Sequence, residues 1–238
     1  MRVLAIDSSS LVASVALVDE ETTIAEYTIN YKKTHSQTLL PMLDEVKKML
    51  DLDMNTIDAI AVSEGPGSFT GLRIGASTAK GLGLALDIPL VAIPTLEGMA
   101  YNLLGNNKLV CPIMDARRNQ VYTGVYRVED KVQILLNQSA LDIYELMNKI
   151  NSLREPVIFL GDGVPVFRDI IKEKTEVEVT FAKSHVNRQR ASAYATLALS
   201  YIKNGKTISA DMFRPDYLRE SQAERERRER TLENKKSK

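Results

Sequence analysis

The same order of apolar segments and acidic turns occurs twice along this sequence. In each copy a short apolar strand ends at an aspartate, Asp7 in the first and Asp115 in the second, and two further strands follow across polar turns. The predicted strands are residues 3–6, 13–18 and 23–29, and then 109–114, 121–126 and 131–136. Because an internal repeat indicates a duplicated unit, we expect an α/β fold with two lobes whose aspartates lie near the junction.

Helical periodicity fills the intervals between these strands. The remaining predicted elements are helices 36–50, 72–86, 95–104, 142–153, 166–174 and 191–203, and strands 57–62, 90–93, 157–160 and 177–181. A polar turn at 105–107 divides the chain into an expected N-terminal lobe, residues 1–106, and a C-terminal lobe, residues 107–219. Residues 220–238 are rich in Glu, Arg and Lys, which predicts a flexible charged tail.

Charge and composition argue against several classes of protein. Lys+Arg and Asp+Glu both number 31, which argues against binding nucleic acid by bulk charge but permits a local basic patch. The single cysteine, Cys111, fits a reducing compartment. No apolar run approaches the roughly 20 residues that span a bilayer, so we expect a cytoplasmic protein with no membrane segment. The two histidines, His35 and His185, lack a zinc-binding spacing, and no metal site is predicted.

A glycine-rich turn, residues 63–75, joins the strand 57–62 to the following helix. Gly65 and Gly67 permit backbone angles that other residues avoid, and Ser68 or Thr70 is placed to cap the helix. A helix N-terminus attracts anions, but the Gly-Lys-Ser/Thr of a P-loop is missing, so tight packing is favoured over phosphate binding. The candidate nucleotide- or anion-binding residues in this turn and at the strand ends are Asp7, Ser9, Gly65, Gly67, Ser68, Asp115 and Gly161.

Four stretches carry a more specific signal. They are Leu4 to Ser9, His35 to Pro41, Gly65 to Gly81, and Asp115 to Tyr122, and Pro215 to Arg219 adds a closing segment. Together they resemble the bacterial TsaB (YeaZ) family, the B subunit of the machinery that makes threonylcarbamoyladenosine in tRNA. The resemblance runs from residue 3 to about residue 219. It implies the two-lobe fold of the sugar kinases, Hsp70 and actin, with duplicated mixed β-sheet lobes backed by helices.

The resemblance implies a non-catalytic subunit. Its paralogue TsaD transfers threonylcarbamoyl to the adenosine beside the anticodon in tRNAs that read codons beginning with A. The chain would pair with TsaD, be joined by the ATPase TsaE, form a homodimer when alone, and meet tRNA only through the complex. No catalytic residue and no cofactor are implied, with nucleotide at most bound at a subunit interface. The sequence agrees, because it lacks the two histidines at helical spacing that hold the metal in TsaD-like catalysts.

Helices 36–50 and 69–86 are the expected partner face. Apolar side chains of the first helix would supply contact area, and glycines of the second would let the partner approach closely. The predicted interface residues are Leu39, Leu40, Met42, Leu43, Val46, Gly71, Arg73 and Gly75. The alternative is that both helices bury these faces in their own lobe, in which case Leu40, Met42 and Met49 offer a second apolar strip.

Two enzymatic functions stay open beside the scaffold role. Asp7, Asp115 and Asp162 each end a predicted strand, and carboxylates converging on a cleft would suit an ATP-binding ATPase or kinase of the same superfamily. Aspartate at a strand end is also an ordinary turn residue. The third function is a glycoprotease-like metallopeptidase, which would need a metal site or nucleophile that we do not find in the sequence.

Overall fold

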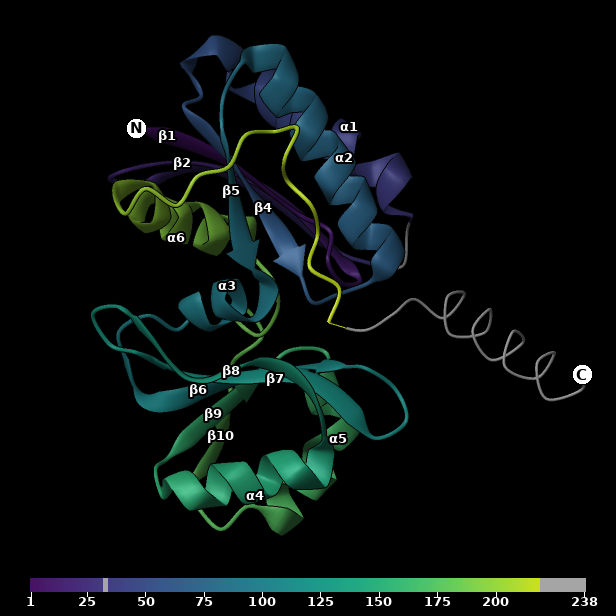
Figure 1. The fold of residues 1–238 in the computed structure, drawn as a ribbon, viewed down its shortest axis with the longest axis vertical. Coiled ribbons are helices and arrows are strands. Elements are labelled where there is room, and N and C mark those ends of the chain that lie inside the picture. Colours follow the sequence, from purple (N-terminus) through teal and green to yellow (C-terminus); the bar gives the residue numbers. More distant parts are fainter. Residues whose placement is uncertain (32–33, 219–238) are drawn as a thin grey trace, which may run out of the picture.

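The computed structural model describes residues 1–31 and 34–218, and its strands form two sheets (Figure 1). The first sheet has the strand order β3-β2-β1-β4-β5, and the second has the order β10-β9-β6-β7-β8. The first contains β1 (Arg2–Asp7), β2 (Val12–Asp19), β3 (Thr23–Asn30), β4 (Ala59–Gly65) and β5 (Leu90–Pro94). The second contains β6 (Asn106–Asp115), β7 (Gln120–Val128), β8 (Val132–Asp142), β9 (Val157–Leu160) and β10 (Val179–Phe181).

The two sheets repeat one topology. Strand β1 pairs antiparallel with β2 and parallel with β4, and β6 pairs antiparallel with β7 and parallel with β9. Asp7 and Asp115 are the last residues of β1 and β6, so they occupy equivalent places in the two sheets. The predicted duplication of mixed-sheet lobes is confirmed.

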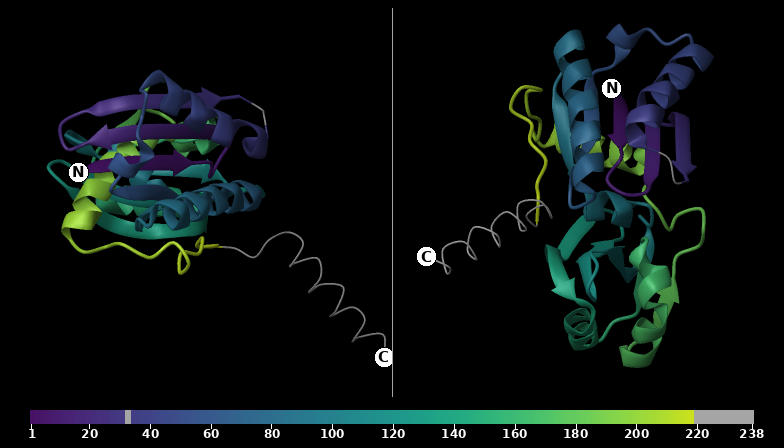
Figure 2. Two further views of the ribbon diagram at one scale, coloured as in Figure 1. Left: turned by 90° about the horizontal axis from the view of Figure 1, so that it is seen from above. Right: turned by 90° about the vertical axis from the view of Figure 1, so that its right-hand side faces the viewer.

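Helices cover both faces of each sheet, and two of them lie between the sheets (Figures 1 and 2). The helices are α1 (His35–Met49), α2 (Phe69–Leu86), α3 (Thr95–Tyr101), α4 (Ile143–Leu153), α5 (Gly163–Lys174) and α6 (Ala191–Lys203), with a 3₁₀ turn at Met54–Thr56. Helices α1 and α2 pack on the outer face of the first sheet, and α6 packs on its inner face. Helices α4 and α5 cover the outer face of the second sheet, and α3 covers its inner face.

The chain returns to the first lobe after the second sheet. Tyr194 and Leu197 of α6 are buried against the first sheet, and Ile208 pairs with Leu90 of β5. The expected C-terminal lobe of residues 107–219 included this helix, which the structure places on the first lobe. The reason is that the first sheet is buried on both faces and needs helices on both sides, whereas α1 and α2 cover only one of them. The predicted charged tail, residues 220–238, lies outside the described residues.

Most predicted elements are present, with differences at their ends. The predicted helix 166–174 begins already at Gly163, and the predicted strand 131–136 continues to Asp142. Ser68 caps α2 as predicted, because its hydroxyl accepts a hydrogen bond from the backbone N–H of Gly71 at 3.3 Å. None of the described helices has the length and apolar character needed to cross a membrane.

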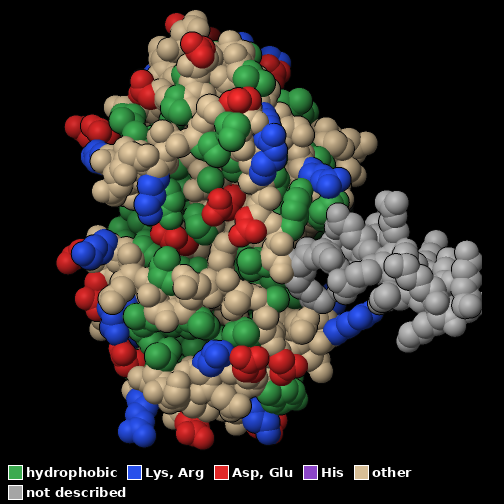
Figure 3. Space-filling model, in the orientation of Figure 1, with side chains coloured by type: hydrophobic (Ala, Val, Ile, Leu, Met, Phe, Trp, Pro, Cys, Tyr) green, Lys and Arg blue, Asp and Glu red, His purple; other side chains and the backbone are tan. Residues whose placement is uncertain are grey.

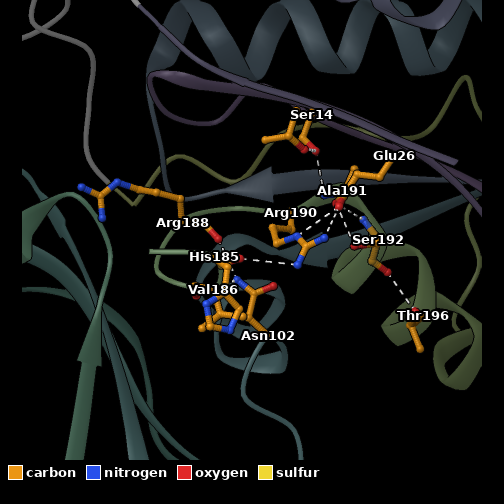
Figure 4. Close-up of polar contacts among 11 residues, drawn as sticks. Ser14, Glu26, Asn102, His185, Val186, Arg188, Arg190, Ala191, Ser192 and Thr196 are labelled. Carbon is orange, nitrogen blue, oxygen red and sulfur yellow. Dashed lines mark hydrogen bonds and ion pairs between the residues drawn. The ribbon is translucent and has the colours of Figure 1, made fainter. Parts of the chain in front are cut away.

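A clamp of polar contacts fixes the segment between β10 and α6 (Figure 4). The Asn102 side-chain amide donates to the carbonyls of Val186 and Arg188, at 3.3 and 2.7 Å. The Arg190 guanidinium pairs with the Glu26 carboxylate, which also accepts hydrogen bonds from Ser192. These bonds tie α3, β3 and α6 together where the chain passes from one lobe to the other.

Candidate functional site

A cleft of about 660 Å³ opens between the two lobes. We call it the interlobe cleft, and it is lined by residues from the ends of β1 and β6 and from the start of α2. Four of the predicted nucleotide- or anion-binding residues line it: Ser9, Gly67, Ser68 and Asp115. The structure therefore brings together residues that stand more than a hundred positions apart in the sequence.

Asp7 is fully buried and does not line this cleft, although Ser9, two residues further along the chain, does. One carboxylate oxygen, Oδ1, accepts a hydrogen bond from the Ser9 backbone N–H at 3.2 Å, whereas Oδ2 is buried with no hydrogen-bond partner among the described residues. Burial raises the pKa of Asp7 above its ordinary value, and the polar groups of Ser63 and Ser9 close to it only partly oppose this. An incompletely satisfied carboxyl group of this kind is costly for the fold.

We expect Asp7→Asn to stabilise the protein at pH 7 by roughly 1–2 kcal/mol, because a neutral amide avoids the cost of burying a charge. The pKa of an unfolded aspartate is about 3.9, and burial raises the folded value. The wild-type protein therefore loses stability as the pH rises from the unfolded value through the folded one. The difference should be small near pH 4 and largest at pH 7 when urea unfolding is measured at both. A variant less stable than wild type at pH 7 would contradict this.

Three predicted glycines serve packing. A Cβ on Gly65 would lie 2.1 Å from the carbonyl oxygen of Asp216, and one on Gly67 would lie 2.4 Å from that of Ser9. Gly161 has φ +106°, and a Cβ there would lie 2.1 Å from the Ile113 carbonyl oxygen. All three glycines therefore allow close packing of the backbone, as the sequence favours for Gly65 and Gly67. Gly65 and Gly161 do not line the interlobe cleft.

The second lobe contributes two carboxylates and two cations at this end of the molecule. Asp162 lines the cleft beside Asp115, and its Oδ1 accepts a hydrogen bond from the Asp115 backbone N–H at 3.3 Å. Burial raises the pKa of Asp162, and Arg188 partly opposes the shift. Arg188 donates to the Gly161 carbonyl at 2.8 Å, and Arg117 lines the cleft directly. Neither arginine is among the site residues predicted from the sequence, because Arg188 is distant in sequence from the strand ends and Arg117 lies in a turn with no binding motif of its own.

His35 makes a local contact at the edge of the cleft. Its Nε2 lies 2.6 Å from the Ser10 carbonyl oxygen, and its ring lines the interlobe cleft. His185 lies instead in a pocket on the second lobe. Within residues 1–31 and 34–218, no group of three or more His, Cys, Asp or Glu side chains is arranged to hold a metal ion.

A second hollow, of about 520 Å³, runs between α1 and α2. We call it the α1–α2 groove, and its apolar lining includes Leu39, Leu40, Phe69 and Ile74. Leu40 is 55% exposed, whereas Leu39 and Leu43 of the same helix are buried. The groove therefore presents apolar area to solvent beside the interlobe cleft.

A stack of three side chains borders the groove. The Arg73 guanidinium lies 3.9 Å from the ring centroid of Phe69, and the rings of Phe69 and Tyr217 are 4.7 Å apart. The Nε of Arg73 donates to the Tyr217 hydroxyl at 3.2 Å. The closing segment thus reaches the start of α2, where the Asp216 backbone N–H also bonds to the Glu64 carbonyl. This stack holds Arg73 in place.

The structure corrects most of the predicted partner face. The α1 side chains predicted for it that are in fact buried in the first lobe are Leu39, Met42, Leu43 and Val46. Gly71 and Gly75 face Ser8 of the same lobe, so they allow close packing inside the chain. Hydrophobic periodicity along a helix marks the side that its own sheet covers. Of the predicted set, only Leu40 and Arg73 are exposed to solvent.

Relatives of this chain are known at both the sequence and the structure level. The family model described as TsaD, tRNA N6-adenosine threonylcarbamoyltransferase, matches residues 22–227. The tRNA threonylcarbamoyladenosine biosynthesis protein TsaB of Bacillus subtilis (strain 168) is 34% identical over 226 residues, covering 94% of this chain and 96% of that protein. The protein of the same name from Escherichia coli (strain K12) is 29% identical, with the same coverage of 94% and 96%. A crystal structure from Pseudomonas aeruginosa, of an uncharacterized protein with similarity to peptidase YEAZ, is similar with a TM-score of 0.77 and 25% identity, covering 92% of this chain and 99% of that one.

Proposed function

This chain belongs to the TsaB family of tRNA threonylcarbamoyladenosine biosynthesis proteins, and from that membership we propose that it is a non-catalytic subunit that pairs with TsaD. In this proposal TsaD transfers threonylcarbamoyl to the adenosine next to the anticodon, in tRNAs that read codons beginning with A. TsaE joins the pair, and the chain forms a homodimer when alone. The complex works in the cytoplasm, and this chain needs no cofactor of its own.

The α1–α2 groove is the observation that carries the proposal. Leu40 is 55% exposed, and burying its apolar side chain against a partner would lower the free energy of the complex. Arg73, stacked on Phe69 at its edge, is of the residue type that contributes most to protein interfaces. A groove with an apolar floor and a fixed arginine at its rim suits a helix of a partner subunit.

The placement of the histidines supports a non-catalytic role. TsaD-like catalysts hold a metal with two histidines on one helix, according to the resemblance drawn from the sequence. Here His35 lies at the start of α1 and His185 lies in a pocket of the second lobe. The two side chains therefore do not converge on one site.

A nucleotide in the interlobe cleft is the second candidate function. The observation that favours it is a pair of buried atoms, Asp7 Oδ2 and Ser9 Oγ, which have no hydrogen-bond partner among the described residues, and Ser9 lines the cleft. A ligand that reaches them would supply the missing hydrogen bonds. Hydrolysis of ATP by the purified chain alone would favour this candidate over the scaffold role.

Reconstitution tests the proposed function. The purified chain is mixed with TsaD, TsaE, unmodified tRNA, ATP and the threonylcarbamoyl donor, and the modified nucleoside is measured by mass spectrometry. We expect modification to fall to background when this chain is left out, since TsaD would then lack its pairing subunit. Unchanged modification without the chain would show that the proposal is wrong.

A further inference from the structure

A pocket of about 740 Å³ lies at the edge of the second sheet, away from the interlobe cleft. We call it the β10 pocket. It is formed where β10, α5 and the end of α3 meet the turn after β10. The side chains that matter for its chemistry are Asn106, Arg168, Phe181, Lys183, Ser184 and His185. The proposed function makes no use of any of them.

The pocket has charge of one sign. Arg168, Lys183 and His185 are its titratable lining residues, and no aspartate or glutamate of residues 1–31 and 34–218 lines it. All three are exposed, and in the described part of the chain none of them forms an ion pair. Nearby cations are neutralised, since Lys108 pairs with Glu178 and Arg190 pairs with Glu26.

This imbalance stands out against the rest of the molecule. The chain has equal numbers of acidic and basic residues. Figure 3 shows Lys and Arg side chains interspersed with Asp and Glu over the face it displays. The charged lining residues of this pocket, Arg168 and Lys183, are both cations, and in a protein with no net charge they produce a local positive potential that attracts anions.

The Arg168 guanidinium and the backbone that carries Lys183 are held in position before any ligand arrives. The Arg168 guanidinium lies 4.2 Å from the ring centroid of Phe181, and that ring packs beside the buried Phe159. The turn that carries Lys183 is closed by a hydrogen bond from the Val186 N–H to the Lys183 carbonyl at 3.0 Å. Asn102 and Arg190 then hold the backbone that follows (Figure 4). Less conformational entropy is therefore lost when an anion binds.

We propose that the β10 pocket binds a backbone phosphate of the RNA substrate. The proposal rests on the proposed function, in which the substrate is tRNA, and it adds a direct contact to the expectation that tRNA is met only through the complex. A planar arginine offers two parallel N–H donors to a phosphate, and Lys183 adds a point charge. Asn106 and Ser184 can donate further hydrogen bonds. Such contacts position RNA without reading its sequence.

Binding of tRNA by two double variants tests this. Arg168→Gln/Lys183→Gln removes two charges from the pocket, and Lys47→Gln/Lys131→Gln removes two exposed charges elsewhere. The affinity of each full-length chain for a labelled unmodified tRNA transcript is measured by fluorescence anisotropy at several salt concentrations. We expect the pocket variant to bind about tenfold more weakly, with the slope of log K against log salt reduced by about 0.7–0.9, which is the contribution of the one phosphate contact that is lost. The control variant should change the affinity less than threefold.

A conservative variant separates charge from folding. Arg168→Lys keeps the positive charge and should retain most of the salt slope. Three results would each overturn the proposal. The wild-type chain does not bind the transcript, both double variants bind the transcript with equal affinity, or AMP binds this pocket more tightly than the transcript does and displaces it. Co-elution with TsaD is measured on the same variants. Loss of RNA binding with co-elution intact supports the pocket, whereas absence of co-elution in the wild type contradicts the proposed function alone.

Discussion

Gly71→Ala is expected to destabilise the protein by about 3 kcal/mol or more, the upper end of the cost of overfilling a packed site. A Cβ at this position would lie 2.0 Å from the Ser8 carbonyl oxygen and 3.2 Å from its carbon. Both are backbone atoms, so no side-chain rotation relieves the clash. The Ser8 hydroxyl also donates to the Gly71 carbonyl at 2.9 Å, so the first turn of α2 cannot move away without breaking that bond. Urea unfolding followed by circular dichroism measures the loss.

The same helix contains its own control. Gly81 is exposed and has no atom within 4 Å of the Cβ that alanine would add. Gly81→Ala should therefore stabilise the protein by about 0.5–1 kcal/mol, which is the difference in helix propensity. Opposite signs for the two substitutions are the expected result. If Gly71→Ala were as stable as wild type, the contact between α2 and the loop after β1 would not be as close as described.

The fold could be predicted from the sequence to a large extent, because the repeated order of strands fixes the topology of each lobe. The pattern does not show which sheet each helix packs against. Helix 191–203 follows the second sheet in sequence but packs on the first, since contacts such as that of Tyr194 with the first sheet depend on the path of the chain in space. Local periodicity reports which side of a helix is apolar and carries no information on the sheet that covers it.

The site was predicted less completely, for two physical reasons. Leu39 and Leu43 repeat at helical spacing because they face their own sheet. The apolar pattern that identifies the helix therefore reports its buried side and not the side that is exposed. Leu40 is outside that pattern and is the side chain left exposed. The β10 pocket was missed because Asn106, Arg168 and Lys183 are distant in sequence and meet only through the fold.

Leu40→Asp is expected to weaken binding to TsaD by about 30-fold or more. This corresponds to the roughly 2 kcal/mol that defines a central interface residue, here with the added cost of burying an unpaired charge. The variant should fold normally, since Leu40 is 55% exposed and a surface substitution changes stability little. The same change at Met42, which is 2% exposed, would instead place a charge in the core and unfold the lobe. Affinity is measured by surface plasmon resonance against immobilised TsaD.

Met49→Asp is the matched control, because it places the same charge on the same helix. Met49 is 77% exposed and lies outside the α1–α2 groove, so its substitution should change the affinity less than threefold. Self-association of the isolated chain should fall with Leu40→Asp and persist with Met49→Asp, if the homodimer uses the groove. If Leu40→Asp and the wild type bound TsaD with equal affinity, the partner face would have to lie elsewhere on the molecule. Equal losses in both variants would mean that charge on α1, rather than occupation of the groove, controls pairing.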